Sequence, residues 1–544
     1  MRRSRVTSLA RLRKTVGLLV VAPVLWGIGS GSGFADAEVG TASPATGSGS
    51  WTVYHANPAG TGVAAPVAAV DTGTAAWTSP ALDGQVYGEP LVYAGRVYVA
   101  TENDTVYALS AATGSVAWSR HLARPVPAAS LPCGDISPSV GITGTPVIDQ
   151  SRGEIFVVAD ELDGGRAAHW LTGLSTETGT VEMTRDVDPP GADPVALLQR
   201  TGLTLDSGRV VFGLGGNDGD CASYRGRVVA VPETGGPAGY FTVDAAPGES
   251  QGAVWMGGAA PVIDGSGHIW VSTGNGSVHS STQGYDDSDS VLELSSSLRL
   301  LQFFAPSTWP ADNSRDLDMS TAPVLLPDGE VLLAGKSRIV YLLDGAHLGG
   351  IGRQQATLGG GTGTITGSAC GGDIDGGAAV VGLTAFLPCT SGVVAIRAAT
   401  SPPALHLLWS SGIAGGPPIV AASLVWTIGY NGVLYGLDPA TGRVRQQAAI
   451  GALANHFPTP SVGDGLLLVP GANRVIAFAA PAPGARAAPT PVAPATRHAG
   501  SPPHAAPTTP ADGSRTWVPV AVAGLVILGG LGWFVRWQRI RGRN

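Results

Sequence analysis

The chain has 544 residues, of which 79 are Gly and 41 are Pro, and only 13% are charged. This composition excludes a long-helix or coiled-coil protein, and a hydrophobic fraction of 44% excludes a chain that is disordered throughout. The formal charge is −8, but the first 37 residues carry +5 and the last nine carry +4, so the stretch between them carries −17. Such an acidic body would repel phosphate backbones, which argues against nucleic-acid binding.

The N-terminus predicts export from the cytoplasm. Six Arg and Lys residues precede an apolar run from Val16 to Ile28, and the small residues Ala35 and Ala37 follow it. This order is typical of a secretory signal peptide over residues 1–37. The alternative is an uncleaved membrane anchor, which the short apolar run disfavours because a membrane span needs about 20 residues.

A repeated unit fills residues 50–480. In the first copy, Pro90 precedes a short apolar stretch, and three more strand-like stretches follow up to Trp118, separated by Gly or polar turns. Comparable starts recur at Pro146, Leu203, Pro261, Pro323, Ala378, Pro418 and Pro460. Eight four-strand units of about 40–50 residues predict an all-β, eight-bladed β-propeller, because such units cannot bury their faces alone.

The last unit is one strand short. It begins at Pro460, and its third strand ends near Phe478. The Thr-Gly-x-x-x-Trp pattern that ends the first unit at Trp118 also occurs before that unit, where it ends at Trp77. We therefore expect the N-terminal strand at Trp77 to complete the last blade, which closes the ring and removes exposed strand edges.

The C-terminus predicts a membrane anchor. Residues 481–516 are rich in Pro, Ala and Thr, which is typical of an extended stalk. Residues 517–535 contain no charge, and four Arg follow in residues 536–544. The arginines predict that this tail is cytoplasmic, so the sequence predicts a single-pass cell-membrane protein whose N-terminal body lies outside the cytoplasm.

The repeat resembles a known family. The segment Ala108–Trp118 is similar to the tryptophan-docking repeat of the quinoprotein alcohol dehydrogenase-like propellers, also called pyrroloquinoline quinone (PQQ) repeats. Copies at Gly173–Gly179 and Gly436–Gly442 keep the Thr-Gly step, but Met183 and Gln446 stand where the Trp is expected. The resemblance covers the whole body and implies the propeller fold. It does not imply catalysis, because docking repeats hold blades together in enzymes and in scaffolds alike.

The four cysteines agree with export. An even number in an oxidising compartment predicts two disulfides, for which three pairings exist. Cys370 and Cys389 lie within one repeat, whereas Cys133 and Cys221 open two Gly- and Asp-rich loops. We favour the pairs Cys370–Cys389 and Cys133–Cys221, and no cysteine spacing is typical of a zinc site.

The resemblance also implies a candidate site for PQQ and calcium. Lys336 follows the pattern of the lysine that contacts the quinone oxygens, and Trp255 is the nearest candidate for the ring-stacking tryptophan. Asn275 and Asp218, or Asp220 in its place, are the candidate calcium ligands, in agreement with the preference of calcium for oxygen. The candidates for the catalytic carboxylate are Asp316 and Asp318.

Ordinary structural roles compete with each of these assignments. Lys336 is the only Lys after the signal peptide, but a solvated Lys beside a turn also explains it. Asn275 belongs to a Thr-Gly-Asn-Gly sequence that forms a good turn. For Asp316 and Asp318, the sequence favours a solvated loop over a catalytic role.

Departures from the family pattern favour a binding or scaffold protein over a dehydrogenase. The family has two adjacent cysteines against the quinone, whereas Gly134 follows Cys133. The stacking tryptophan would fall near Gly257 or Gly258, and no CxxCH haem motif is present. We therefore expect a module without a cofactor that binds an extracytoplasmic protein or small ligand. The alternative is a PQQ- and calcium-dependent dehydrogenase that oxidises an alcohol or sugar.

Overall fold

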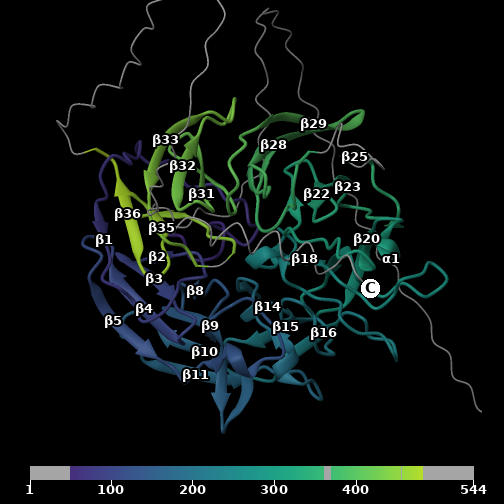
Figure 1. Cartoon of the computed structure of the whole chain (residues 1–544), viewed down its shortest axis with the longest axis horizontal. Helices are drawn as coiled ribbons and strands as arrows, with labels where there is room; N and C mark the ends of the chain where they lie inside the picture. The colour runs from purple at the N-terminus through teal and green to yellow at the C-terminus, as the bar shows by residue number, and fades with distance from the viewer. Residues whose placement is uncertain (1–48, 360–368, 455, 482–544) are drawn as a thin grey trace, which may run out of the picture. The chain divides into compact units, whose positions relative to one another are not determined.

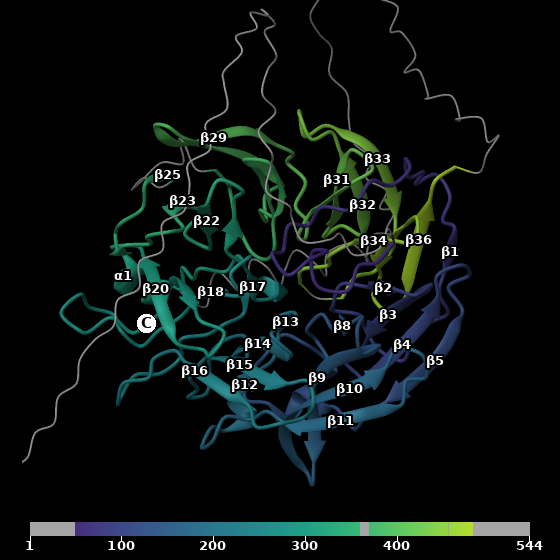
Figure 2. The ribbon, with the colours of Figure 1, turned by 180° about the vertical axis from the view of Figure 1, so that it is seen from behind.

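A computed structural model describes residues 49–359, 369–454 and 456–481, which form eight antiparallel sheets around a ring (Figures 1 and 2). The predicted all-β, eight-bladed β-propeller is confirmed. The predicted signal peptide, the stalk beyond residue 481, the span 517–535 and the tail 536–544 lie outside the described residues. Within the described ranges, no helix is long and apolar enough to cross a membrane.

The first four blades follow one another along the chain, each from its inner to its outer strand. Blade 1 contains β2 (Leu91–Tyr93), β3 (Arg96–Ala100), β4 (Thr105–Ser110) and β5 (Val116–His121). Blade 2 contains β8 (Val147–Asp149), β9 (Glu154–Asp163), β10 (Arg166–Ser175) and β11 (Val181–Asp186). Blade 3 contains β12 (Leu197–Leu198), β13 (Thr204–Asp206), β14 (Arg209–Gly216), β15 (Arg227–Pro232) and β16 (Gly239–Thr242). Blade 4 contains β17 (Val262–Ile263), β18 (Ile269–Thr273), β19 (Ser290–Leu294), β20 (Leu300–Ala305) and β24 (Gly350–Ile351).

The other four blades continue in the same order. Blade 5 contains β21 (Val324–Leu325), β22 (Glu330–Ala334), β23 (Val340–Asp344) and β25 (Ala356–Leu358). Blade 6 contains β26 (Ala379–Val381), β27 (Thr384–Leu387), β28 (Val394–Thr400) and β29 (Pro403–Ser410). Blade 7 contains β30 (Ile419–Ala421), β31 (Leu424–Gly429), β32 (Val433–Leu437) and β33 (Val444–Ala449). Blade 8 contains β34 (Ser461–Gly463), β35 (Leu466–Pro470), β36 (Val475–Ala479) and β1 (Trp77–Thr78).

Short elements occupy the connections between blades. They are the ribbon of β6 (Val126–Pro127) and β7 (Ser139–Val140), the helix α1 (Trp309–Asn313), and the 3-10 turns Ala128–Ser130, Pro194–Ala196 and Met256–Gly258. The eight inner strands begin directly after the residues at which the repeat predicted them. The strand β24 was not predicted; it lies in the connection from β23 to β25 of blade 5 but pairs in parallel with β20 of blade 4.

The burial of the strands follows their position in a blade. The central strands β18 and β22 are buried along their whole length, whereas β33 at the outer edge alternates between exposed and half-buried residues. A strand that is covered on both faces by neighbouring blades needs a continuous apolar run, which explains the Val- and Leu-rich sequence of the inner strands.

The N-terminal strand closes the ring as predicted. Trp77 pairs with Ala477 and Thr78 with Ile476 in an antiparallel register. In Figure 1, the purple β1 lies beside the yellow β36, so strands about 400 residues apart share one sheet. The last blade therefore has four strands, with β1 as its outer strand.

Tryptophans on outer strands dock onto glycines of the next blade. Trp77 donates its indole N–H to the Ala111 carbonyl over 2.8 Å, and its ring covers Gly114 so closely that an added Cβ would lie 2.3 Å from Cε3. Trp118 and Trp409 repeat this arrangement on the following blades, above Gly179 and Gly442. Each contact joins two blades, because the Trp and the Gly belong to neighbouring sheets.

The two repeat copies without Trp still connect their blades. Met183 of blade 2 reaches Gly235 in blade 3, where its Cε lies 3.5 Å from the position of an added Cβ. Gln446 of blade 7 donates to the Val70 carbonyl over 2.8 Å and accepts from the Thr72 N–H over 3.2 Å. Van der Waals contact by Met183 and two hydrogen bonds of the Gln446 amide thus take the place of the tryptophan contact.

Residues 49–64 cross one end of the central channel. Their backbone forms hydrogen bonds with the inner strands or adjacent turns of six blades, at Asp464, Val92, Ile148, Ile263, Val380 and Val420. These positions lie toward the turns that join each inner strand to the next strand. Tyr54 and His55 are fully buried between the blades, and their rings stack with centroids 4.2 Å apart. The second strand of each blade runs antiparallel to the inner strand, so the loops that follow the second strands lie at the opposite end of the channel.

We predict that Gly114→Ala lowers the free energy of unfolding by about 3 kcal/mol. The φ angle of Gly114 is +70°, and the new methyl group would also collide with Trp77. Gly95→Ala is the matched control, because φ is +73° but no atom lies within 4 Å of the new Cβ; we expect a loss of about 1 kcal/mol. Urea denaturation of the full chain measures both values, and equal losses would contradict a role for the Trp dock.

Candidate functional site

The predicted site residues gather at the end of the channel opposite residues 49–64. Asp220 lies in the loop after β14 and Asn275 in the loop after β18. Asp318 precedes β21, and Lys336 follows β22. These loops come from the neighbouring blades 3, 4 and 5, and they leave the sheets at the same end. We refer to this region as the channel mouth.

Lys336 is held by two carboxylates. Its Nζ lies 2.8 Å from Oδ1 of Asp316 and forms a second ion pair with Oδ2 of Asp318. The Lys336 N–H also donates to the Asp318 carbonyl over 2.9 Å. Burial lowers the pKa of Lys336, but the charges of Asp318 and Asp316 outweigh it and raise the pKa above its ordinary value. The lysine is therefore a fixed cation rather than a solvated side chain beside a turn.

Asn275 connects Lys336 and its carboxylates to the next loop. Its backbone N–H donates to Oδ1 of Asp318 over 2.9 Å, and its side-chain amide donates to Oδ2 of Asp220 over 2.7 Å. Tyr224 donates its hydroxyl to Oδ1 of Asp220 over 2.7 Å. The φ angle of Asn275 is +52°, a left-handed conformation that Asn tolerates. A continuous chain of contacts thus runs from Lys336 to Tyr224.

Two glycines allow the loops to approach one another. A Cβ on Gly335 would lie 2.0 Å from the Asp318 carbonyl oxygen, and one on Gly274 would lie 2.6 Å from the Asp318 Cβ. The backbones at Gly274 and Gly335 are therefore in direct contact with Asp318. Asp318 is completely buried as a result.

Buried carboxyl groups crowd around Lys336, and burial and mutual repulsion shift their pKa values upward. Burial raises the pKa of Asp220, although hydrogen bonds from Tyr224 and Asn275 oppose the shift. Burial and the charge of Asp318 raise the pKa of Asp289 well above its ordinary value, and within the described residues neither Asp289 carboxylate oxygen has a hydrogen-bond partner. Burial also raises the pKa of Asp375 to about 6.

The other two predicted residues lie at the edge of this cluster. Asp218 is exposed in the same loop as Asp220, and it is Asp220 that contacts Asn275. Trp255 donates its indole N–H to the Gly216 carbonyl over 2.9 Å, and its ring lies against Gly215. Trp255 therefore packs on the end of β14, at the boundary of blades 3 and 4.

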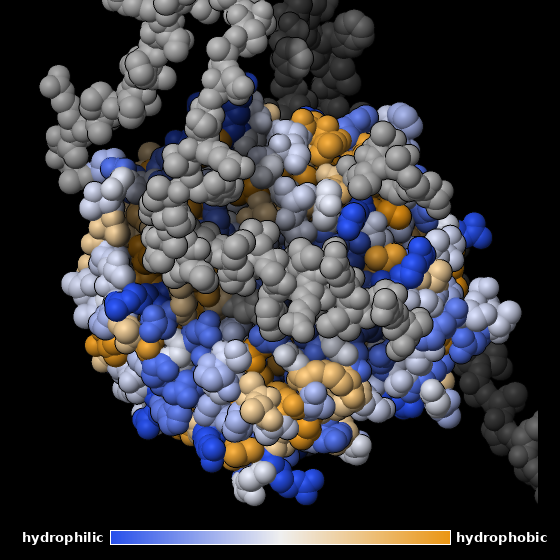
Figure 3. All heavy atoms as spheres, in the orientation of Figure 1, coloured by the Kyte–Doolittle hydropathy of each residue, from blue (hydrophilic) through white to orange (hydrophobic). Residues whose placement is uncertain are grey.

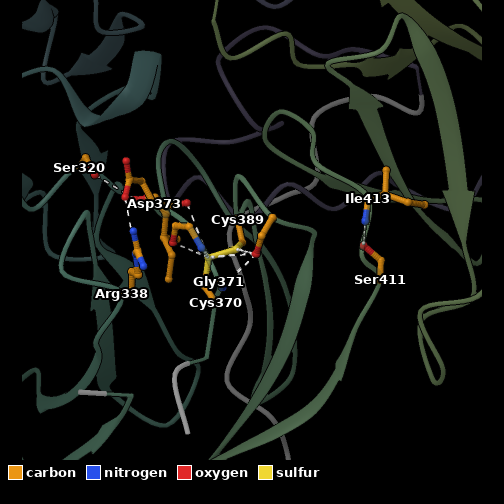
Figure 4. The surroundings of a disulfide bond; sticks show 11 residues. Ser320, Arg338, Cys370, Gly371, Asp373, Cys389, Ser411 and Ile413 are labelled. Carbon is orange, nitrogen blue, oxygen red and sulfur yellow. Dashed lines mark hydrogen bonds and ion pairs between the residues drawn. A yellow bond between two sulfur atoms is a disulfide. The ribbon is translucent and has the colours of Figure 1, made fainter. Parts of the chain in front are cut away.

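Both predicted disulfides are present, and both brace loops at the mouth. Cys133–Cys221 joins the connection between blades 1 and 2 to the loop that carries Asp220. Cys370–Cys389 joins the segment before β26 to the loop after β27. Figure 4 shows Arg338 and Asp373 beside the second disulfide, where they form an ion pair of 3.8 Å.

A buried arginine contacts segments that precede the inner strands of several blades. Arg200 donates from Nη1 to the Thr143 carbonyl over 3.0 Å. Its guanidinium lies 5.8 Å from the ring centroid of Tyr87 and 5.6 Å from that of Phe457. Neither Arg200 nor Tyr224 belongs to a motif, so the sequence alone does not indicate either residue. Tyr224 lies in the same loop as Asp220, whereas Arg200 meets Tyr87 and Phe457 only in the assembled ring.

The residues fit a bound cation better than they fit a quinone. Asp220, Asn275 and Asp318 supply the oxygen donors that calcium prefers. The place of the family's stacking tryptophan is closed, since a Cβ on Gly257 would lie 2.3 Å from the Gly376 nitrogen and one on Gly258 would lie 2.7 Å from Arg200 Nη1. Cys133 pairs with Cys221, so it does not form a disulfide with an adjacent cysteine. Within the residues that the structure describes, the site therefore lacks the two surfaces that would hold the quinone ring.

Comparisons with known proteins agree with the fold. Residues 65–299 match the sequence model of a family described as outer membrane protein assembly factor BamB. No curated protein sequence matches the chain. The fold is similar to that of the quinohemoprotein alcohol dehydrogenase from Comamonas testosteroni, with a TM-score of 0.56 and 17% identity over 80% of this chain and 81% of that one. A europium-containing methanol dehydrogenase gives a TM-score of 0.58 and 14% identity over 79% of this chain and 98% of that one.

We predict that Lys336→Met destabilises the protein by about 3–5 kcal/mol, because it leaves the buried Asp318 carboxylate without a cation. Adding Asp318→Asn should recover most of this loss, since the unpaired charge is then gone. Arg338→Met is the control, with an expected loss of less than about 1 kcal/mol because the Arg338 side chain is 41% exposed. Urea denaturation measures the three variants, and a Lys336→Met effect no larger than the control would contradict the ion-pair geometry.

A second prediction concerns Asp104, which is buried in the loop after β3. Burial and the charges of Asp160 and Glu161 raise its pKa to about 10. The folded chain then keeps a proton that the unfolded chain releases above about pH 4, so the contribution of Asp104 to stability falls as the pH rises. Asp104→Asn needs no proton, and Asn tolerates the local φ of +56°.

We expect the stability of Asp104→Asn relative to wild type to increase by about 1.4 kcal/mol per pH unit between pH 5 and pH 8. Urea denaturation at three pH values measures this slope. Glu182→Gln on the exposed face of β11 should show no such slope. A flat difference for Asp104→Asn would mean that Asp104 is ionised in the folded protein.

Proposed function

We propose that this chain is a cell-surface binding module whose channel mouth accepts a cationic group of an extracytoplasmic protein or small ligand. The predicted signal peptide and the apolar stretch 517–535 support a body outside the cytoplasm that one helix anchors to the cell membrane. The body between the two basic ends carries a charge of −17, which suits a positively charged partner.

The acidic surroundings of Lys336 carry this proposal. Asp316 and Asp318 already form ion pairs with Lys336. Four further carboxyl groups interact electrostatically with members of this group, namely those of Asp218, Asp220, Asp373 and Asp375. Lys336 and Arg338, which pairs with Asp373, are two cations beside these six carboxylates. An incoming ammonium, guanidinium or metal ion would reduce the repulsion, and the field would also direct it to the mouth.

The sequence match supports a protein as the source of the cationic group. The family that residues 65–299 match is named for an outer membrane protein assembly factor, which is a property of that family and a proposal for this chain. The surface agrees with a polar contact. On the face drawn in Figure 3, hydrophobic side chains of the described residues are scattered among hydrophilic ones.

A PQQ- and calcium-dependent dehydrogenase is the second candidate. The contacts that join Lys336, Asp318 and Asn275 favour it, because these are the residues that the family resemblance assigns to the quinone and the metal. The closed positions of Gly257 and Gly258 oppose it. The binding module is the better-supported function for this reason.

Titration of the full chain tests the proposal. A Lys- and Arg-containing decapeptide and spermidine are the probes, with a decapeptide of acidic residues as the negative probe. We expect Asp218→Asn and Asp316→Asn each to weaken binding of a cationic probe about fivefold, as expected for loss of one partly exposed charge pair. Asp163→Asn, which removes an exposed charge at the end of β9, should leave the affinity unchanged.

The outcomes separate the candidates. Tighter binding of the decapeptide than of spermidine indicates a protein partner, and the reverse indicates a small ligand. Equal effects of Asp218→Asn and Asp163→Asn would overturn the proposal, because attraction would then be spread over the whole surface. Retention of added PQQ in the presence of calcium, with reduction of an artificial electron acceptor by an alcohol or sugar, would establish the second candidate instead.

A further inference from the structure

A second cluster of potential ligands lies on blade 4, at the end opposite the channel mouth. Asp264, His268 and Glu293 each offer one ligand atom, and these atoms lie within 4.8 Å of one another. His268 Nδ1 is 2.5 Å from Glu293 Oε1 and 3.6 Å from Asp264 Oδ2. The function proposed for the mouth makes no use of this cluster.

Strand register brings the three residues together. Asp264 follows β17 and His268 precedes β18, and the backbone N–H of Asp264 donates to the carbonyl of His268 across this hairpin. Trp270 pairs with Glu293 on β19. Side chains two residues apart share a face of a sheet, so His268, Trp270 and Glu293 lie on the same face of blade 4.

Groups outside the cluster already orient both carboxylates. Trp270 donates its indole N–H to Asp264 Oδ2 over 3.0 Å, and the backbone N–H of Ser266 donates to Asp264 Oδ1 over 2.7 Å. Gln302 donates to Glu293 Oε2 over 2.5 Å, which leaves Oε1 directed at His268. The bonds from Gln302 to Glu293 Oε2 and from Ser266 to Asp264 Oδ1 reach the oxygen that faces away from the His268 ring, as is typical of the outer shell of metal sites. Asp264 Oδ2 faces the His268 ring and also accepts the bond from Trp270.

Charge favours a divalent ion at this position. With a neutral imidazole, the two carboxylates of Asp264 and Glu293 carry two negative charges, and the Glu293 side chain is only 8% exposed. A divalent cation would cancel both charges. An imidazole nitrogen among the ligands favours zinc or a similar transition metal over calcium or magnesium.

We propose that Asp264, His268 and Glu293 bind a divalent transition metal such as zinc, with water completing the coordination. The His268 side chain is 36% exposed, which leaves a path for the ion and for this water. The metal links three strands of blade 4. Through Gln302, which also bonds to the Gly345 carbonyl and the Leu348 N–H, it stabilises the contact with blade 5.

Zinc titration of the chelator-treated full chain tests this site. Calorimetry should show a zinc site that is weakened at least about 100-fold in His268→Ala and in Glu293→Gln. Gln302→Met keeps all three ligands and should weaken zinc binding about 10-fold. His406→Ala, on the exposed edge of blade 6, is the matched control and should bind zinc as the wild type does.

Two further measurements exclude loss of folding as the cause. Zinc should raise the melting temperature of the wild type and of His406→Ala but not of His268→Ala, while the metal-free proteins melt at similar temperatures. Cobalt should quench the fluorescence of the nearby Trp270 in the wild type, and Trp270→Phe should remove that part of the quenching. The proposal is overturned if the wild type binds no zinc, or if His268→Ala and Glu293→Gln bind it with wild-type affinity.

Discussion

The docking of a tryptophan over a glycine of the next blade is the contact on which this ring depends. A single four-stranded sheet leaves both faces uncovered, and the indole of Trp77 or Trp118 fixes the distance and tilt between two such sheets through one hydrogen bond and one stacked surface. The glycine matters as much as the tryptophan, because any side chain there would push the ring away. Where Met183 and Gln446 replace the tryptophan, the blades still meet.

Closure of the ring turns separate loops into one site. Asp220, Asn275 and Lys336 lie on three different blades, and each is an ordinary loop residue within its own repeat. They meet because the blades are held at fixed angles. The two disulfides add local constraint at Cys221 and Cys389, beside the loops that carry the acidic residues. The geometry of the mouth is therefore a property of the whole ring.

The repeat made the fold predictable from the sequence. Each inner strand begins after the residue that the repeat identifies, and the missing fourth strand of the last blade points directly to Trp77. The resemblance to a known family located Lys336 and Asn275, but it could not choose between Asp218 and Asp220, because the path of a Gly-rich loop is not encoded by spacing. The cluster of Asp264, His268 and Glu293 could not be anticipated, since Glu293 joins it only through the register of β18 with β19.

The path of residues 49–64 has a consequence for the order of folding. This segment leaves the ribosome before any blade, yet its hydrogen-bond partners extend from Val92 to Asp464. It can take its final position only after the last blade has been synthesised. In the same way, β1 can pair with β36 only after β36 has been synthesised. Contacts between residues so distant in sequence slow assembly, so the ring remains open and in need of protection until the C-terminal repeat has been synthesised.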